Sequence, residues 1–175
     1  MTDKEAQYQK WEQDLKKVEL PLWSELPKFD LYMDQVTAFV NGVLGQIGIS
    51  PVTPAMVNNY VKNKAIIAPV KKKYQTMQIA DIIMISLLKP AFSLGTIRHA
   101  IDQVTANMYP QQAYDNFIKR LTFSFKNIDN ISNRALEEKD LNEKLMQVAA
   151  NVVIDRVQSE KLLDIIKKPL PQLKS

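Results

Sequence analysis

Amide and ammonium side chains recur between residues 53 and 73 at spacings that could read a nucleic acid. Lys62 lies three residues after Asn59 and four after Asn58, so a helix would carry all three on one face. An asparagine amide can pair with a base edge, adenine being its favoured partner, and a lysine ammonium can neutralise a phosphate. Three further lysines stand together at residues 71–73. The pattern therefore indicates a surface for double-stranded DNA.

The positive charge of the chain is concentrated in this same region. The net formal charge is only +4, from 23 lysines and arginines against 19 aspartates and glutamates in 175 residues. Residues 35–80 hold five lysines and no carboxylate, so this segment carries +5 and the remainder −1. A surface that meets phosphates must be free of like charge. Burial accounts for part of the depletion, and a lysine run alone is more often a solvated loop.

The composition excludes several kinds of catalytic and metal site. The chain has no cysteine and one histidine, His99, which excludes disulfides, thiol nucleophiles, thiolate zinc sites, iron–sulfur clusters and multi-histidine metal sites. His99 falls on the outer face of its helix and is interpreted as a solvated histidine. The acidic cluster at residues 137–140 fits the first turns of a helix, where carboxylates offset the helix dipole. We therefore expect no enzymatic activity, no cofactor and no metal.

The distribution of apolar residues argues against a membrane protein. The first residues are polar and lack the apolar core of a signal peptide, and no apolar stretch is long enough to cross a bilayer. Hydrophobic residues make up 46% of the chain, which is enough for a core. We expect a soluble, cytoplasmic protein.

Hydrophobic periodicity predicts a chain that is nearly all helix. The predicted helices cover residues 4–17, 30–44, 54–63, 76–89, 94–104, 111–128 and a long segment from residue 132. The residues predicted to cap them at their N-termini are Asp30, Thr53, Thr76, Ser93 and Ser132. Pro21 and Pro27 mark a connector after the first helix.

The helix over residues 54–63 has two distinct sides. Pro54 suits the first helical position, directly after the Thr53 cap. At about 100° per residue, the side chains expected to face a core are those of Met56, Val57, Tyr60 and Val61. Those expected on the opposite side are Ala55, Asn58, Asn59 and Lys62. The outer side has no acid, so it is predicted to meet base edges and phosphates.

Residues 65–74 predict a small β wing rather than a helix. The segment is short and β-branched, with a central proline at Pro69. Its lysines, Lys71, Lys72 and Lys73, would lie on solvent or on phosphate, and Tyr74 is expected to anchor the wing. The predicted fold class is all-α with this one small β wing.

The C-terminal part carries two amphipathic segments. In the second, the apolar positions are Leu136, Leu141, Leu145, Val148 and Val152, the last four at a spacing of four, three and four, which resembles a packing seam. We expect these helices to form a homodimer interface or to hold an apolar ligand. The predicted divisions are an N-terminal helix and connector (1–28), a DNA-binding domain (29–108) and a C-terminal helical region (109–175).

The order of elements resembles the MerR-type winged helix-turn-helix. In that family the second helix ends near paired tyrosines. It is followed by Gly-Leu-Ile-x-Pro, then by a wing that closes on Arg-x-Tyr, and then by Gly-Phe-Ser-Leu-x-Glu-Ile. The corresponding stretches here are Asn59-Tyr60, Ile66-Ile67-Ala68-Pro69, Lys72-Lys73-Tyr74 and Ala91-Phe92-Ser93-Leu94-Gly95-Thr96-Ile97. The wing lacks the usual arginine, Pro110 interrupts the continuation into a dimerisation helix, and no cysteine is present to bind a metal effector.

Residues 30–107 resemble more closely an uncharacterised bacterial family of domain-of-unknown-function proteins. The shared stretches are Leu-Tyr-Met-Asp-Gln-Val at residues 31–36, Thr-Pro-x-Met-x-Asn-Asn-Tyr-Val-Lys at residues 53–62 and the Lys-Lys-Lys-Tyr wing. The MerR resemblance implies the winged helix-turn-helix fold and DNA binding by analogy.

Together, the residues and the resemblance predict a sequence-specific DNA-binding protein that regulates transcription. The residues predicted to contact double-stranded DNA, or to support the contact, are Thr53, Ala55, Asn58, Asn59, Lys62, Lys71, Lys72, Lys73 and Tyr74. The alternative is a protein-interaction module that keeps the winged-helix shape without binding DNA.

Overall fold

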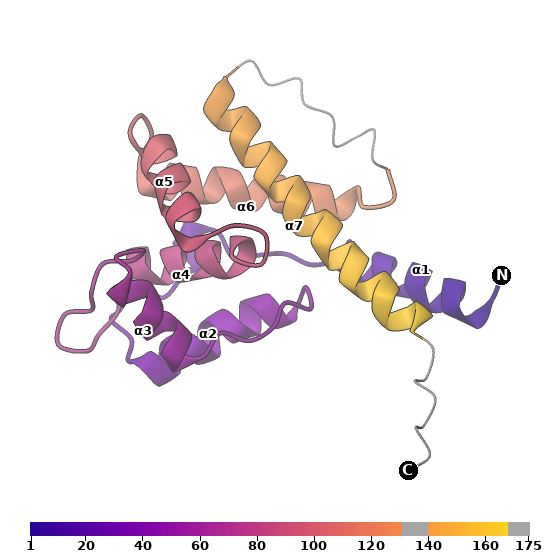
Figure 1. Cartoon of the computed structure of the whole chain (residues 1–175), viewed down its shortest axis with the longest axis horizontal. Helices are drawn as coiled ribbons and strands as arrows, with labels where there is room; N and C mark the ends of the chain where they lie inside the picture. The colour runs from indigo at the N-terminus through magenta and orange to yellow at the C-terminus, as the bar shows by residue number, and fades with distance from the viewer. Residues whose placement is uncertain (131–139, 168–175) are drawn as a thin grey trace, which may run out of the picture.

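The computed structural model describes residues 1–130 and 140–167 of the chain, which fold as packed helices (Figure 1). In chain order the elements are α1 (Asp3–Leu15), the 3-10 turn η1 (Trp23–Glu25), α2 (Met33–Gly45), α3 (Pro54–Lys62), α4 (Thr76–Leu88), α5 (Leu94–Thr105), α6 (Pro110–Lys126) and α7 (Leu141–Ile166). No strand forms among the described residues. The predicted all-α class is confirmed.

Two of the predicted helix caps are confirmed. The Thr53 hydroxyl accepts the Met56 N–H at 3.3 Å, and Pro54 is the first residue of α3. The Ser93 hydroxyl accepts the Thr96 N–H at 3.1 Å at the start of α5. Both caps satisfy a backbone donor that the first helical turn leaves without a partner.

Two other predicted caps are wrong. Asp30 lies outside α2, whose N-cap is Tyr32, and Gln35 Oε1 accepts the Tyr32 N–H at 2.9 Å. Thr76 is the first residue of α4 rather than its cap. The N-cap is Gln75, whose N–H donates to Gln78 Oε1 at 2.7 Å, and the Thr76 hydroxyl donates to the Pro27 carbonyl oxygen at 2.6 Å. In both places a glutamine in the first turn accepts the backbone N–H of the N-cap residue, and the residue that the sequence suggests is not the cap.

The described part of α7 packs through a face that the sequence did not predict. The predicted cap, Ser132, lies outside the described residues, and the described helix begins at Leu141 with Asp140 as its N-cap. Of the predicted seam, Leu141, Leu145 and Val148 are 77%, 43% and 42% exposed and Val152 is half-buried, while Leu136 lies outside the described residues. The residues of α7 that are buried are Met146, Gln147, Ala150, Val153, Ile154, Val157 and Ile165. The predicted seam is therefore not the face that packs on the rest of this chain.

The core is centred on α4, which is apolar on nearly every side. Ile79, Ile82, Ile83 and Ile85 are all 0% exposed. Figure 1 shows α4 between α2 and α6, and both helices contact it, while α7 packs along α6 and reaches α1. Buried side chains from Leu15 to Val157 form one cluster. The predicted divisions after residues 28 and 108 remain predictions.

The described helices show no membrane-spanning candidate. Over residues 1–130 and 140–167, no helix combines the length and the apolarity that a bilayer crossing requires.

Candidate nucleic-acid interface

Helix α3 presents the two sides that its sequence predicts. Val57 and Tyr60 are 0% exposed, and Met56 and Val61 are half-buried. The exposed residues of the opposite side are Ala55, Asn58, Asn59 and Lys62. The predicted faces are confirmed, so the amides and the ammonium group lie on the surface.

The turn between α2 and α3 is held by Asn41, a residue that no sequence pattern indicates. Its Oδ1 accepts the Val52 N–H at 2.7 Å, and its Nδ2 donates to the Val52 carbonyl oxygen at 3.0 Å. One side chain thus satisfies both backbone groups of a residue that is only 2% exposed. This contact fixes the start of α3 against α2.

Replacing Asn41 by Ala is expected to destabilise the protein by about 2 kcal/mol, because two buried backbone groups lose their partners. Urea unfolding measures the loss. Gln46→Ala, an exposed position just after the same helix, is the matched control. If Asn41→Ala were as stable as this control, the turn would have to be held by other contacts.

A tight turn stands where the sequence predicts the tip of a wing. The Val70 N–H donates to the Lys73 carbonyl oxygen at 3.2 Å, and the Lys73 N–H donates back to the Val70 carbonyl oxygen at 2.9 Å. Lys71 and Lys72 are the two residues between them. They are both exposed, so the turn raises two ammonium groups from the surface.

The predicted β wing is reduced to two isolated bridges. Besides the pair at the turn, Leu31 and Tyr74 exchange backbone hydrogen bonds of 3.0 and 2.8 Å. Pro69 has no N–H to extend a ladder, which explains why no strand forms over these described residues. The Tyr74 side chain is 2% exposed, so it anchors the turn from the core side and does not lie on the surface.

Both turn lysines adopt a backbone conformation that lysine disfavours. The φ angles of Lys71 and Lys72 are +50° and +63°. This left-handed region costs an L-residue with a side chain about 1 kcal/mol or more, and Asn-Gly is the usual pair in such turns. Lysine at both positions therefore adds charge at the expense of backbone stability, which indicates that the charge has a use.

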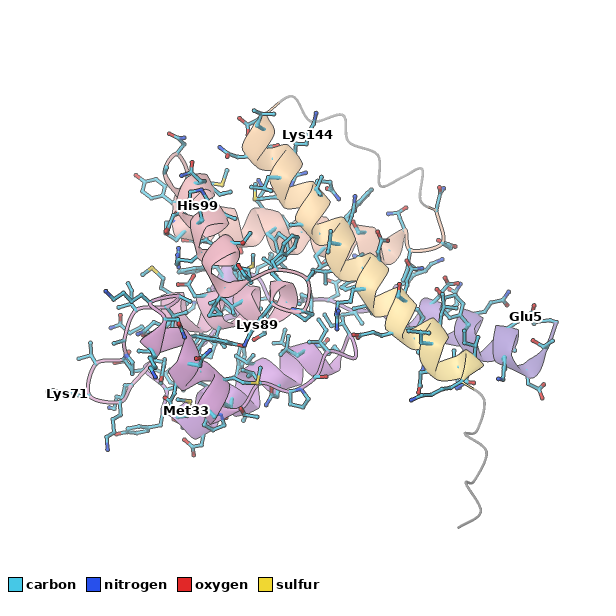
Figure 2. The ribbon with its side chains drawn as sticks, in the orientation of Figure 1. Glu5, Met33, Lys71, Lys89, His99 and Lys144 are labelled. Carbon is cyan, nitrogen blue, oxygen red and sulfur yellow. The ribbon has the colours of Figure 1, made fainter. Side chains whose placement is uncertain are left out.

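The lysines of this surface have no acidic partner among the described residues. Lys62, Lys71 and Lys72 make no ion pair there. Lys73 is half-buried, with its Nζ 5.3 Å from the centroid of the Tyr32 ring. Figure 2 shows Lys71 at the outer edge of the molecule, on the turn that projects beside α3. These ammonium groups are available to phosphates.

The two asparagines of α3 differ in how much of their amide is available. Asn63 Nδ2 donates to the Asn59 side-chain oxygen at 2.9 Å and to the Asn59 carbonyl oxygen at 2.8 Å. The Asn58 amide makes no hydrogen bond within the described residues. Both the donor and the acceptor of the Asn58 amide are therefore available at the surface.

Two side chains tie the segment after α3 to the helices behind it. Arg98 Nη1 on α5 donates to the Ala65 carbonyl oxygen at 3.2 Å and to Asp81 Oδ2 at 3.3 Å. Gln78 Nε2 on α4 donates to the carbonyl oxygens of residues 67 and 68 at 2.9 and 3.1 Å. These contacts hold the lysine turn in place, and sequence spacing does not reveal them.

Asp81, which accepts a hydrogen bond from Arg98, is the titratable group among the residues that hold the segment after α3. Burial raises the pKa of Asp81 to about 6, against the attraction of the Arg98 guanidinium, and the nearby Asp102 carboxylate adds to the rise. The folded protein thus holds a proton that the unfolded chain releases near pH 4. The contribution of Asp81 to stability is present below about pH 4 and is lost as the pH rises through 6.

Replacing Asp81 by Asn is expected to remove this pH dependence. The free energy of unfolding of the variant, relative to that of the wild type, should rise by roughly 3 kcal/mol between pH 4 and pH 7.5, at about 1.36 kcal/mol per pKa unit. Urea unfolding at several pH values measures the difference, whatever constant offset the substitution adds. A difference that does not change with pH would contradict the raised pKa.

No metal centre accompanies this surface in the part of the chain that the structure describes. No group of three His, Asp or Glu side chains gathers there. His99 is exposed on α5, as Figure 2 shows, which confirms the interpretation as a solvated histidine.

A protein-family model matches the middle of the chain. Residues 21–117, more than half of the chain, match a family model described as "Domain of unknown function (DUF1836)". The match spans η1 and α2 to α5, and so includes Asn41, the amide face of α3, the lysine turn and Arg98. No curated protein and no solved structure matches the chain.

Proposed function

The chain belongs to the DUF1836 domain family. From the surface that this domain exposes, we propose that the protein binds double-stranded DNA sequence-specifically and regulates transcription. One observation carries the proposal. Two exposed lysines occupy strained turn positions without an acidic partner in the described residues, beside the exposed amides of α3. A turn selected for stability alone would have other residues at these positions.

In the proposed complex, α3 enters the major groove. A helix of nine residues fits the groove, and its outer face carries side chains suited to base edges. The Asn58 amide makes a bidentate contact with adenine, with Asn59 beside it, and the Ala55 methyl group meets a thymine methyl. The N-terminus of α3 at Thr53 offers backbone N–H groups to a phosphate.

Lysines on α3 and in the neighbouring turn supply the affinity. Lys62 on α3 and Lys71, Lys72 and Lys73 in the turn neutralise phosphates, with Tyr74 anchoring the turn from below. We further propose that α2 and α3 form the helix-turn-helix of a MerR-like winged domain, and that residues 70–73 are its shortened wing. The contacts of Asn41 and Arg98 keep the two parts at a fixed separation.

We also propose that the protein binds DNA as a homodimer. Leu141, Leu145 and Val148 form an exposed apolar stripe on α7 that the described chain does not cover. A second copy can cover the same stripe about a two-fold axis. A dimer would read two half-sites of opposite orientation.

One observation favours the alternative of a protein-interaction module. Val70 and Tyr32, which flank Lys73, are 67% and 51% exposed, and Ile67 is 62% exposed. Apolar side chains on a basic surface also suit a protein partner.

Selection of duplexes from a randomised pool separates the two functions. The proposal predicts that a common motif containing adenines is enriched, and that the enriched duplex binds about a thousandfold more tightly than an unrelated duplex. Weak binding without enrichment, lost at moderate salt, would contradict it and leave the interaction module.

A further inference from the structure

A pocket lies where α4, α5, α6 and α7 come together, beside η1 (Figure 1). Ile97 and Phe117 on its wall are each 2% exposed, whereas Met77 and Leu145 are 38% and 43% exposed. The pocket therefore runs from the surface into the core. Helix α5 packs on α4 and α6 but has less contact with α7, which leaves this space between them.

The wall of the pocket is apolar and rich in rings and sulfur. Apolar atoms make up nearly all of the surface that the wall exposes. The aromatic and methionine side chains that contribute most to this character are Trp23, Tyr114, Phe117, Met77, Met84 and Met146. The rings of Trp23 and Tyr114 meet edge to face, with their centroids 5.9 Å apart. Ring edges and thioether sulfurs both make favourable contacts with a further aromatic ring.

The wall offers no free group to a charged ligand. The Thr105 hydroxyl donates to a carbonyl oxygen of its own helix at 2.7 Å, and the Tyr114 hydroxyl donates to the Pro21 carbonyl oxygen at 2.9 Å. Asp81, the charged residue on the described wall, accepts a hydrogen bond from Arg98 at 3.3 Å. A charged ligand would therefore leave water for a wall that holds no unpaired counter-charge.

The size of the pocket limits its occupant. Its volume is about 130 Å³, close to the roughly 150 Å³ of an apolar cavity that stays dry and binds benzene. Water forms few hydrogen bonds against such a wall, so an apolar molecule of this size replaces it favourably.

We propose that this pocket binds a compact, uncharged molecule built on one aromatic ring. The ring lies among the methionine and aromatic side chains, and its burial removes apolar surface of both the ligand and the wall from water. Because Ala100 on α5 and Leu145 on α7 both line the pocket, the ligand also adds a contact between these two helices. The proposal does not rest on DNA binding.

Calorimetry on the full chain with toluene, benzoate and benzylamine tests the binding. The three probes share one ring and differ in charge. We expect saturable binding of toluene, with both charged probes at least about tenfold weaker, because their charge finds no free partner in the pocket. Toluene at ten times its Kd should also raise the melting temperature by roughly 3 to 5 °C. No binding of toluene, or equal binding of either charged probe, would overturn the proposal.

Methionine labelled with ¹³C at the methyl group locates the ring without any substitution. Met77, Met84 and Met146 line the pocket, whereas Met33 on α2 and Met56 on α3 lie outside it. In NMR spectra, the ring of bound toluene should shift the methyl resonances of the first three and leave those of the other two unchanged. Shifts confined to Met33 and Met56 would place the ligand elsewhere and contradict the site.

Ala100→Leu is expected to close the pocket. Ala100 is half-buried on the α5 wall, and the larger side chain takes up the space that the ring needs. Toluene affinity should fall at least about tenfold, since the ring loses its contact area. Ala38→Leu, the same change on an exposed position of α2 outside the pocket, is the matched control and should leave the affinity unchanged. Full affinity in Ala100→Leu, or a melting temperature clearly below that of Ala38→Leu, would show that the space is not there.

A second copy of the chain is the other candidate occupant, because Leu145 belongs both to the pocket wall and to the exposed stripe of α7. Calorimetry at protein concentrations below and above the one at which light scattering detects a dimer separates the two. We expect the same toluene affinity at both concentrations. An affinity that falls as the protein concentration rises would assign the pocket to the second copy and refute the small-molecule site.

Discussion

Replacing Lys71 by Asn and Lys72 by Gly is expected to stabilise the protein while it weakens binding to duplex DNA. Both residues have positive φ, and Asn-Gly is the pair that such two-residue turns prefer. Relief of the backbone strain at these two positions should add about 1 kcal/mol to the free energy of unfolding, which urea unfolding measures. This gain in stability should be measurable in the absence of DNA.

The same double substitution removes two phosphate contacts. Each contact makes affinity vary with salt to a power of about −0.9, which corresponds to roughly eightfold in affinity at 0.1 M salt. Loss of both contacts should therefore lower duplex affinity roughly 60-fold at that salt concentration. Fluorescence anisotropy with a labelled duplex measures this loss of affinity. A variant that is more stable and yet binds more weakly separates the role of the charge from that of the fold.

The matched control removes two positive charges elsewhere. Lys10 on α1 and Lys144 on α7 are exposed, and Figure 2 shows Lys144 far from Lys71. The double variant Lys10→Ala, Lys144→Ala has the same net charge as the turn variant and should keep nearly full affinity. Equal losses in the two variants would mean that only total charge matters, which would contradict a located DNA-binding surface.

Asn58→Ala is expected to relax sequence preference more than it lowers overall affinity. The Asn58 amide has both its donor and its acceptor available, and a bidentate contact discriminates against the wrong base by roughly 1 to 3 kcal/mol. The ratio of affinities for the selected and an unrelated duplex should fall roughly 10- to 100-fold. Because no phosphate contact is lost, the salt dependence should stay the same.

Asn59→Ala is the informative comparison for this prediction. The Asn59 side-chain oxygen already accepts from Asn63, so its removal should cost less discrimination than that of Asn58. Binding of both variants to the selected duplex and to single-base changes of its adenines measures the order. A larger loss for Asn59, or an unchanged ratio for Asn58→Ala, would contradict the assigned base contact.

The sequence was sufficient for features that depend on neighbours within a turn or two of helix. The two faces of α3 and the caps at Thr53 and Ser93 follow from spacing and residue type, and the structure confirms them. It was insufficient where a neighbouring residue takes the cap position or a distant group binds the side chain. Thr76 could serve as a cap by residue type, but α4 has Gln75 as its N-cap, and the Thr76 hydroxyl donates to the carbonyl oxygen of Pro27, 49 residues earlier.

The same limit applies to the candidate site. The exposure of Asn58 and Lys62 was predicted, because it depends only on the helical period. Arg98 reaches a carbonyl oxygen 33 residues earlier in the chain, and Asn41 reaches a residue 11 positions later. Such contacts follow from how α2, α4 and α5 pack, and a single sequence carries no periodic signal for them. The packed face of α7 was missed for the same reason.

The salt dependence of duplex affinity tests the central claim most directly. With Lys62, Lys71, Lys72 and Lys73 each neutralising one phosphate, the slope of log affinity against log salt should be about −3.6 per chain. The variant with Asn at position 71 and Gly at position 72 should lose about half of that slope, about 1.8. An affinity that does not change with salt, or the same slope in the wild type and this variant, would contradict a DNA-binding surface at the lysine turn.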